Sequence, residues 1–135
     1  MSIAASFEAG RLGRIAVVRI RPNEDLVTAV EAACREHRLA HAIVRSAVGS
    51  LVDAVLEVGD RTLEVAGPGI EILTLAGEVR SDKVGVPEAD LRGTIADGKA
   101  QVYGGRFRRG ANPICITLEL VLQEWLPAVG ASRET

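Results

Sequence analysis

Aromatic side chains, cysteine and histidine are all scarce in this chain. Its 135 residues include one Trp, one Tyr and two Phe, or 3% aromatics, so the sequence offers no aromatic platform on which single-stranded nucleic acid could stack. The core must instead be built from Val, Ile, Leu and Ala, which favours a sheet because β-branched side chains suit a pleated, half-buried surface. Cys34 and Cys115 lie far apart in apolar contexts, and we interpret both as buried thiols rather than as a disulfide or a metal pair.

Long apolar runs and an excess of basic residues are also absent. No uninterrupted apolar stretch approaches the ~20 residues that span a bilayer, and the N-terminus lacks the basic and then apolar pattern of a secretory signal. We therefore expect a cytoplasmic protein without a membrane partner. The formal net charge of −2 and the sequence pI of about 5.7 provide no global attraction for a polyanion, so binding to DNA would need a local basic patch.

The sequence does contain the pattern of one mixed α/β domain. Its length of 135 residues and its 47% apolar composition suit a single core. We predict an α/β (α+β) fold with one main helix and a mixed, largely antiparallel sheet of about seven or eight strands. The domain is expected to span 14–126, between a flexible arm over 1–13 and a disordered tail over 127–135. The predicted strands are 14–21, 41–48, 51–58, 61–66, 70–79, 90–96, 99–108 and 114–122.

Turn and cap residues set the expected element boundaries. Pro22 and the acidic residues after it mark the start of the helix, with Asn23 as the expected N-cap and the end near Leu39. A tight break is expected at Gly49-Ser50 between two strands. Asp97-Gly98 is a dipeptide typical of hairpin turns, so the strands on either side of it should be neighbours.

The predicted strand 70–79 has the clearest alternation in the chain. Both of its faces are mostly apolar, so we expect it to lie in the centre of the sheet. Ile70, Ile72 and Thr74 are expected on one face, and Glu71, Leu73 and Leu75 on the other.

Two glycine-bearing segments carry a resemblance to a known family. Residues 67–77 read Gly-Pro-Gly-Ile-Glu-Ile-Leu-Thr-Leu-Ala-Gly, and residues 101–106 read Gln-Val-Tyr-Gly-Gly-Arg. They resemble the PPC domain, a small module of plants and prokaryotes that is often labelled DNA-binding. The corresponding family segments read roughly G-P-F-E-I-L-S-L-S-G and G-G followed by histidine. Residues 21–26 and 46–51 are similar to two further PPC segments in the correct order, and the resemblance runs from about Ile15 to Leu122.

The resemblance implies a PPC-like fold and a homotrimer whose subunits pack sheet edges and faces together. It also implies a regulatory or accessory protein, of the bacterial type without an AT-hook, that binds double-stranded DNA. Fold does not determine function, so two alternatives stay open. One is a protein or enzyme that binds a small anion or another small molecule in a polar pocket, and the other is a purely structural oligomeric module.

Asp90, Arg92 and Arg106 stand where the PPC family carries the three histidines of its metal site. Residues two apart on a strand share a face, so Asp90 and Arg92 should lie together, with Arg106 on the neighbouring strand. A guanidinium has no acceptor for a metal, and we predict no metal and no cofactor. Two interpretations remain: a structural ion cluster, or an anion site in which the arginines hold a phosphate or carboxylate. Glu71 is a further candidate for this pocket.

A basic patch overlaps this group. Arg106, Arg108 and Arg109 form the densest cluster of basic residues and are the candidates for DNA contact, with Arg106 and Arg108 expected on the same strand face. A solvated strand end is the alternative explanation. Ser46 and Ser50 have no convincing base partner, so no catalytic residue is assigned.

Overall fold

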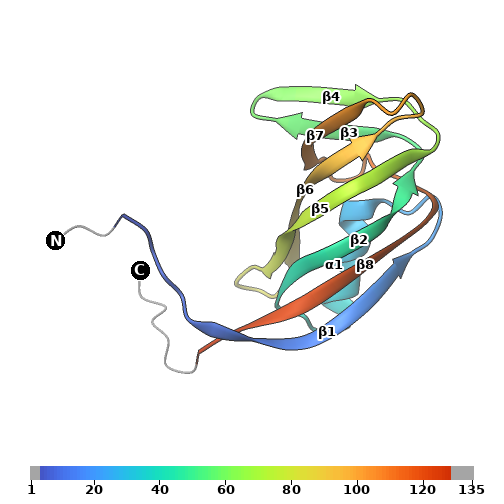
Figure 1. Cartoon of the computed structure of the whole chain (residues 1–135). Coiled ribbons are helices and arrows are strands. Elements are labelled where there is room, and N and C mark those ends of the chain that lie inside the picture. Colours follow the sequence, from blue (N-terminus) through green and yellow to red (C-terminus); the bar gives the residue numbers. More distant parts are fainter. Residues whose placement is uncertain (1–3, 129–135) are drawn as a thin grey trace.

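The strands join one antiparallel sheet, with a helix packed against one of its faces (Figure 1). The computed structural model describes residues 4–128, and within this range the order of the eight strands is β1-β8-β2-β5-β6-β7-β3-β4. The expected fold class is therefore confirmed, and every strand pair is antiparallel. The elements are β1 Gly10–Ile20, α1 Leu26–Glu36, β2 His41–Leu51, β3 Ala54–Val58, β4 Arg61–Val65, β5 Ile70–Ser81, β6 Pro87–Ala96, β7 Val102–Phe107 and β8 Ile114–Pro127.

Asp25, rather than Asn23, caps the N-terminus of α1. The Asp25 carboxylate accepts a hydrogen bond from the backbone N–H of Thr28 at 2.9 Å, whereas Asn23 lies before the helix with a φ of 70°. The same carboxylate accepts hydrogen bonds from the backbone N–H groups of Gly110 and Asn112. The expected cap was wrong because Asp25 satisfies the helix and the loop before β8 together, which the local sequence does not reveal.

The C-terminal end of α1 is held by Arg14 of β1. The helix ends at Glu36, earlier than expected, because Arg38 takes a φ of 56° and turns the chain. Arg14 donates hydrogen bonds to the carbonyl oxygens of His37 at 3.1 Å and of Arg38 at 3.0 Å, and its Nε lies 3.1 Å from Glu124 of β8. Arg14 thus satisfies carbonyls that the helix end leaves unpaired. With 11 residues α1 cannot reach across a bilayer, and no other helix within residues 4–128 can do so.

Helix α1 covers only one face of the sheet. In Figure 1 it lies behind the sheet, across β2 and β8. The covered face carries the fully buried Leu118, Leu120 and Leu122 of β8, which form one core with Leu26 and Val30 of α1. Burial of each of these side chains contributes about 1.5–3 kcal/mol to stability. The residues that alternate with the buried ones point to the opposite face, which no helix covers within the described chain.

Strand β2 continues through Gly49-Ser50, where a break was expected. Gly49 lies directly against β8. A Cβ at this position would stand only 2.5 Å from the carbonyl oxygen of Thr117. The glycine therefore permits close approach of two strands rather than a turn. The chain turns at residues 52–53 instead, and β3 follows.

Strand β1 begins at Gly10 rather than at Arg14. Gly10 lies in register with Pro127, the last residue of β8, so part of each predicted terminal segment belongs to the sheet. The long β8 supplies a partner for residues 10–13, which have no strand pattern of their own. Residues 1–3 of the predicted arm and 129–135 of the predicted tail lie outside the described residues.

Strand β5 is central, as expected, with β2 and β6 as its neighbours. The predicted alternation is wrong beyond Leu73, because a bulge in the pairing with β6 lies between Ile72 and Thr74. Leu75 is therefore buried on the covered face and Thr74 is exposed on the uncovered one. This shift adds the Thr74 hydroxyl to the polar side chains of the uncovered face.

Candidate functional site

Strands β6 and β7 bring Asp90, Arg92 and Arg106 together on the uncovered face. Arg92 lies in direct register with Arg106, as the hairpin around Asp97-Gly98 predicts. Arg92 donates hydrogen bonds from Nε and Nη2 to the two carboxylate oxygens of Asp90, at 3.1 and 3.2 Å. The Nε of Arg106 lies 3.3 Å from Asp90 Oδ1. One carboxylate thus pairs with two guanidiniums, and we call these three residues the arginine cluster.

The arginine cluster is open to solvent. The side chains of Asp90, Arg92 and Arg106 are 45%, 65% and 48% exposed. Hydrogen bonding from Arg92, together with the charges of both arginines, lowers the pKa of Asp90 from its ordinary value, although partial desolvation opposes this. Exposed ion pairs contribute little to stability. Stability alone therefore does not account for two arginines around one acid.

The arginine cluster does not fit a metal ion. Zinc is bound by imidazole, thiolate or carboxylate groups, and the cluster offers only the Asp90 carboxylate, which already pairs with both arginines. Across residues 4–128, no three His, Cys, Asp or Glu side chains are placed to hold a metal.

Glu71 lies too far from the arginine cluster to join it. It is in register with Ala96, at the far end of β6 from Asp90, and six residues of strand correspond to about 20 Å. Two acids lie beside the cluster. Glu57 of β3 is in register with Arg106. Glu78 of β5 lies opposite Asp90 and forms ion pairs with Arg80 and His41. Sequence reasoning missed Glu78 because spacing along one strand does not set the register with the next.

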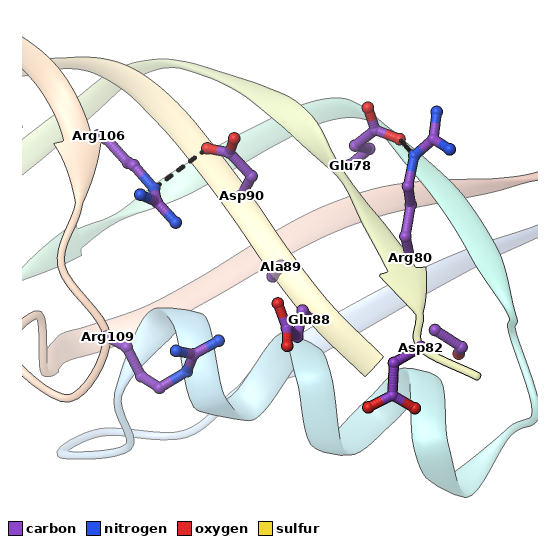
Figure 2. Close-up of a pocket in the computed structure, with 9 residues that line it drawn as sticks. Glu78, Arg80, Asp82, Glu88, Ala89, Asp90, Arg106 and Arg109 are labelled. Carbon is purple, nitrogen blue, oxygen red and sulfur yellow. Dashed lines mark hydrogen bonds and ion pairs between the residues drawn. The ribbon is translucent and has the colours of Figure 1, made fainter. Parts of the chain in front are cut away.

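A pocket of about 400 Å³ lies on one side of the cluster. Figure 2 shows the side chains that line it, from Asp90 to Arg109. Its acidic side chains are Glu78, Asp82, Glu88 and Asp90, and its basic side chains are Arg80, Arg106 and Arg109. Because the two signs are mixed, the charge of this pocket does not select one class of ligand.

Arg109 is joined to α1 by a buried carboxylate. Its Nε donates to Glu31 Oε1 at 3.1 Å, and its Nη2 donates to Glu31 Oε2. Glu31 is only 7% exposed and also accepts a hydrogen bond from the backbone N–H of Ala89 at 2.8 Å. The hydrogen bonds from Arg109 to Glu31, together with the Glu31 charge, raise the pKa of Arg109 above its ordinary value. The sequence analysis did not find Glu31, which lies far from Arg109 along the chain.

Arg108 does not share a strand face with Arg106, contrary to expectation. Strand β7 ends at Phe107, and the chain turns at Arg108, whose backbone N–H bonds to the carbonyl oxygen of Val55 at 3.1 Å. The side chain of Arg108 is exposed. Even so, Arg106, Arg108 and Arg109 line one groove of about 420 Å³. The three candidates for DNA contact are therefore close together, although Arg109 is neutralised by Glu31.

A separate pocket of about 420 Å³ lies over the β6–β7 hairpin on the uncovered face. Arg92 and Arg106 line it together with Thr74, Thr94 and Gly104. The hydroxyl oxygens of the two threonines are 2.8 Å apart and share a hydrogen bond. We call it the threonine pocket.

Residues 7–126 match the family described as the Plants and Prokaryotes Conserved (PCC) domain. The chain belongs to this family. It is the family that the glycine-bearing segments resemble, so the expectation from the sequence is confirmed. This PCC domain carries Asp90, Arg92 and Arg106 at the positions where the resemblance implies histidines.

The PCC domain is also similar to part of a larger protein. The bifunctional protein GlmU of Synechococcus sp. (strain JA-2-3B'a(2-13)) is 36% identical to it over 112 residues, which make up 82% of this chain. The chain spans 17% of the length of the curated relatives that it matches.

Solved structures share the fold of this PCC domain. The metal-containing protein AF0104 from Archaeoglobus fulgidus has a TM-score of 0.78 at 23% identity, with 91% of this chain and 87% of that chain covered. A protein of Bacteroides thetaiotaomicron described as a candidate DNA-binding protein has a TM-score of 0.68 at 17% identity, with 85% of this chain and 83% of that chain covered. Both likenesses concern the fold.

Proposed function

We propose that this PCC domain is a regulatory or accessory protein that acts as a homotrimer, with the β1 half of the uncovered sheet face as the surface through which subunits meet. The observation that supports the trimer is the group of apolar side chains on this face. The accessory role is supported by the relatives in which a similar segment forms a small part of a larger protein.

The apolar group lies over the strands at the β1 end of the sheet. Val17 of β1 is 61% exposed, Val48 of β2 is 74% exposed and Leu73 of β5 is 50% exposed. The strand register puts Val17 and Val48 on the face opposite the fully buried Leu120, and Leu73 is exposed at the bulge of β5. Apolar side chains that gather on an otherwise polar surface are typical of contact sites between proteins. Association of subunits would remove this group from water.

Light scattering on the purified protein tests this assembly. We expect the parent to have three times the 14.3 kDa mass of the chain, and Val48→Glu to have a smaller mass because an unpaired carboxylate would be buried in the contact. Val84→Glu is the matched control, since Val84 is 84% exposed in the loop between β5 and β6, away from the strands. A parent with the mass of one chain would disprove the trimer.

Contact with double-stranded DNA is the second candidate function. It is favoured by the groove lined by Arg106, Arg108 and Arg109, and one protein of the same fold is described as a candidate for DNA binding. The net charge of −2 opposes it, and so does the pairing of Arg109 with Glu31. Any DNA contact would therefore depend mainly on Arg106 and Arg108.

Fluorescence anisotropy with a labelled duplex, at low and at near-physiological salt, tests the DNA proposal. We expect binding that weakens as salt rises and that is reduced in Arg106→Ala and Arg108→Ala, because each removes a phosphate contact. Arg61→Ala, which removes an exposed charge from the edge strand β4, is the control. No binding at low salt, or equal losses in all three variants, would disprove a DNA-binding face at these arginines.

A further inference from the structure

We propose that Arg92 and Arg106 bind a small oxyanion, the carboxylate or phosphate group of a small molecule, in the threonine pocket over Gly104. The site belongs to each subunit by itself. It depends neither on trimer formation nor on contact with DNA.

The charge balance across β6 and β7 favours an anion. Arg92 and Arg106 lie directly opposite each other on one face, and like charges at such positions repel. Asp90 supplies one negative charge for the two positive ones. Glu57 of β3 is also in register with Arg106, but among the described residues the only ion pair of Arg106 is with Asp90. A bound oxyanion would supply a second ion-pair partner for the two guanidiniums.

The arginines have hydrogen-bond donors to spare. A guanidinium carries five N–H hydrogens. Arg92 donates hydrogen bonds from Nε and Nη2 to Asp90. Arg106 contacts Asp90 only as an ion pair through Nε, so the Nη groups of Arg106 have no partner within the described chain. Carboxylate and phosphate oxygens match the spacing of the guanidinium N–H groups and accept from them in pairs. The free donors therefore suit an oxyanion better than they suit a simple halide.

The threonine hydroxyls add one more donor. Thr74 Oγ1 accepts a hydrogen bond from the backbone N–H of Thr94 at 3.0 Å, and it shares a hydrogen bond with Thr94 Oγ1 at 2.8 Å. That shared bond uses one of the two hydroxyl hydrogens, so the other can be donated to a ligand. Both threonines line the same pocket as the two arginines.

Gly104 forms part of the pocket wall without being required by the fold. A Cβ at this position would meet only Thr94 Cγ2 at 3.4 Å and the Gly93 carbonyl oxygen at 3.5 Å, which are ordinary contacts. Gly93 is different, because a Cβ there would stand 2.1 Å from the carbonyl oxygen of Thr74. Gly93 is thus explained by strand packing, whereas the lack of a side chain at Gly104 keeps the space beside Arg106 open.

The rim of the pocket limits the size of the anion. The pocket encloses about 420 Å³, and Glu57 lines it together with the arginines. A polyanion that extended past the arginines would meet Glu57 and Asp90, and repulsion would weaken its binding. A small molecule with a single oxyanion group would bring the least negative charge near Glu57 and Asp90.

Isothermal titration with inorganic phosphate, and separately with acetate, tests this site. We expect saturable binding of at least one probe, with one site per chain. Arg106→Ala should weaken it by about tenfold or more, since it removes charge-assisted hydrogen bonds. Gly104→Val should abolish it by filling the pocket, with the mass from light scattering unchanged. Arg61→Ala should bind as the parent does. Binding of phosphate alone points to a phosphoryl group, and binding of acetate alone to a carboxylate.

Three results would overturn the proposal. The first is no saturable binding of either probe to the parent. The second is an Arg106→Ala variant that binds as tightly as the parent, or an Arg61→Ala variant that loses as much. The third is a Gly104→Val variant that keeps full binding but changes mass, which would assign the glycine to subunit packing. None of these results decides whether the parent is a trimer, because its own mass answers that question.

Discussion

The two halves of the sheet differ in strand length and in what they carry on the uncovered face. Strands β1, β8 and β2 have 11, 14 and 11 residues, and apolar side chains such as Val17 and Val48 are exposed on them. Strands β6, β7 and β3 have 10, 6 and 5 residues, and they carry the arginine cluster and Gly104. One half therefore suits contact between subunits, and the other suits a polar ligand.

The halves also differ in how they are held to α1. In the first half, long ladders hold the strands, and Arg14 ties the helix end to β1 and β8. In the second half, the β6–β7 ladder starts only at Arg92, and Glu31 of α1 occupies the edge of β6 at Ala89. A buried side chain thus takes the place of a strand partner, which makes the second half depend on a few specific residues.

The largest predicted effect is that of Arg109→Ala. It leaves the buried Glu31 carboxylate without its cationic partner, and we expect the free energy of unfolding to fall by about 2–3 kcal/mol, less than for a fully buried pair because the guanidinium is half exposed. Urea unfolding measures this difference. Arg108→Ala is the matched control and should change stability by less than ~0.5 kcal/mol. Equal effects of the two substitutions would show that the Glu31 contact does not hold the second half.

A smaller effect is expected for Arg14→Ala in the first half. The substitution removes the hydrogen bonds to the carbonyls of His37 and Arg38, but the ladders between β1, β8 and β2 remain. We expect faster amide hydrogen exchange in the last turn of α1 and a loss of stability smaller than that of Arg109→Ala. If instead the whole sheet exchanges faster, the first half depends on single side chains as much as the second does.

A still smaller effect concerns the titration of Asp90. Its pKa is lowered in the folded protein, so the cluster contributes stability above the ordinary carboxylate pKa of about 4, and this contribution is lost as the pH falls through the lowered value. Arg92→Ala should raise the pKa of Asp90 more than Arg106→Ala does, because Arg92 donates two hydrogen bonds. A carbon-detected NMR titration of the carboxyl group measures both values. The opposite order would mean that Arg106 is the main partner in solution.

The smallest effect is expected from removal of metal. Because the arginine cluster does not fit a metal ion, treatment with EDTA should leave the unfolding temperature unchanged. Elemental analysis of the untagged protein should detect no stoichiometric zinc. Stoichiometric zinc together with a lower unfolding temperature after EDTA would mean that another part of the chain binds the metal.

Local patterns predicted much of this arrangement. The spacing of Asp90 and Arg92 placed them on one face because side chains on a strand alternate, and Asp97-Gly98 made the strand of Arg106 their neighbour. The glycine-bearing segments identified the family. Each of these inferences depends on residues that are close in sequence, or on a turn that joins two adjacent strands.

Other predictions were wrong because the features they concern depend on partners far along the chain. Asn23 is not the cap because Asp25 also binds the loop at Gly110, and Gly49 does not turn the chain because β8 packs against it. The bulge in β5 reversed the expected direction of Thr74. Each outcome was set by contact with a segment that the local pattern does not contain.

The sequence by itself determined the class of fold, the family and the grouping of Asp90, Arg92 and Arg106, since these depend on strand periodicity, turns and short motifs. Only the tertiary structure decided that Glu71 lies far from the group, that Glu31 neutralises Arg109, and that one face of the sheet stays uncovered. Register between strands and the path of a single helix determine these features. They result from packing of the whole chain, because the free energy of a buried contact does not depend on how far apart its two residues are in sequence.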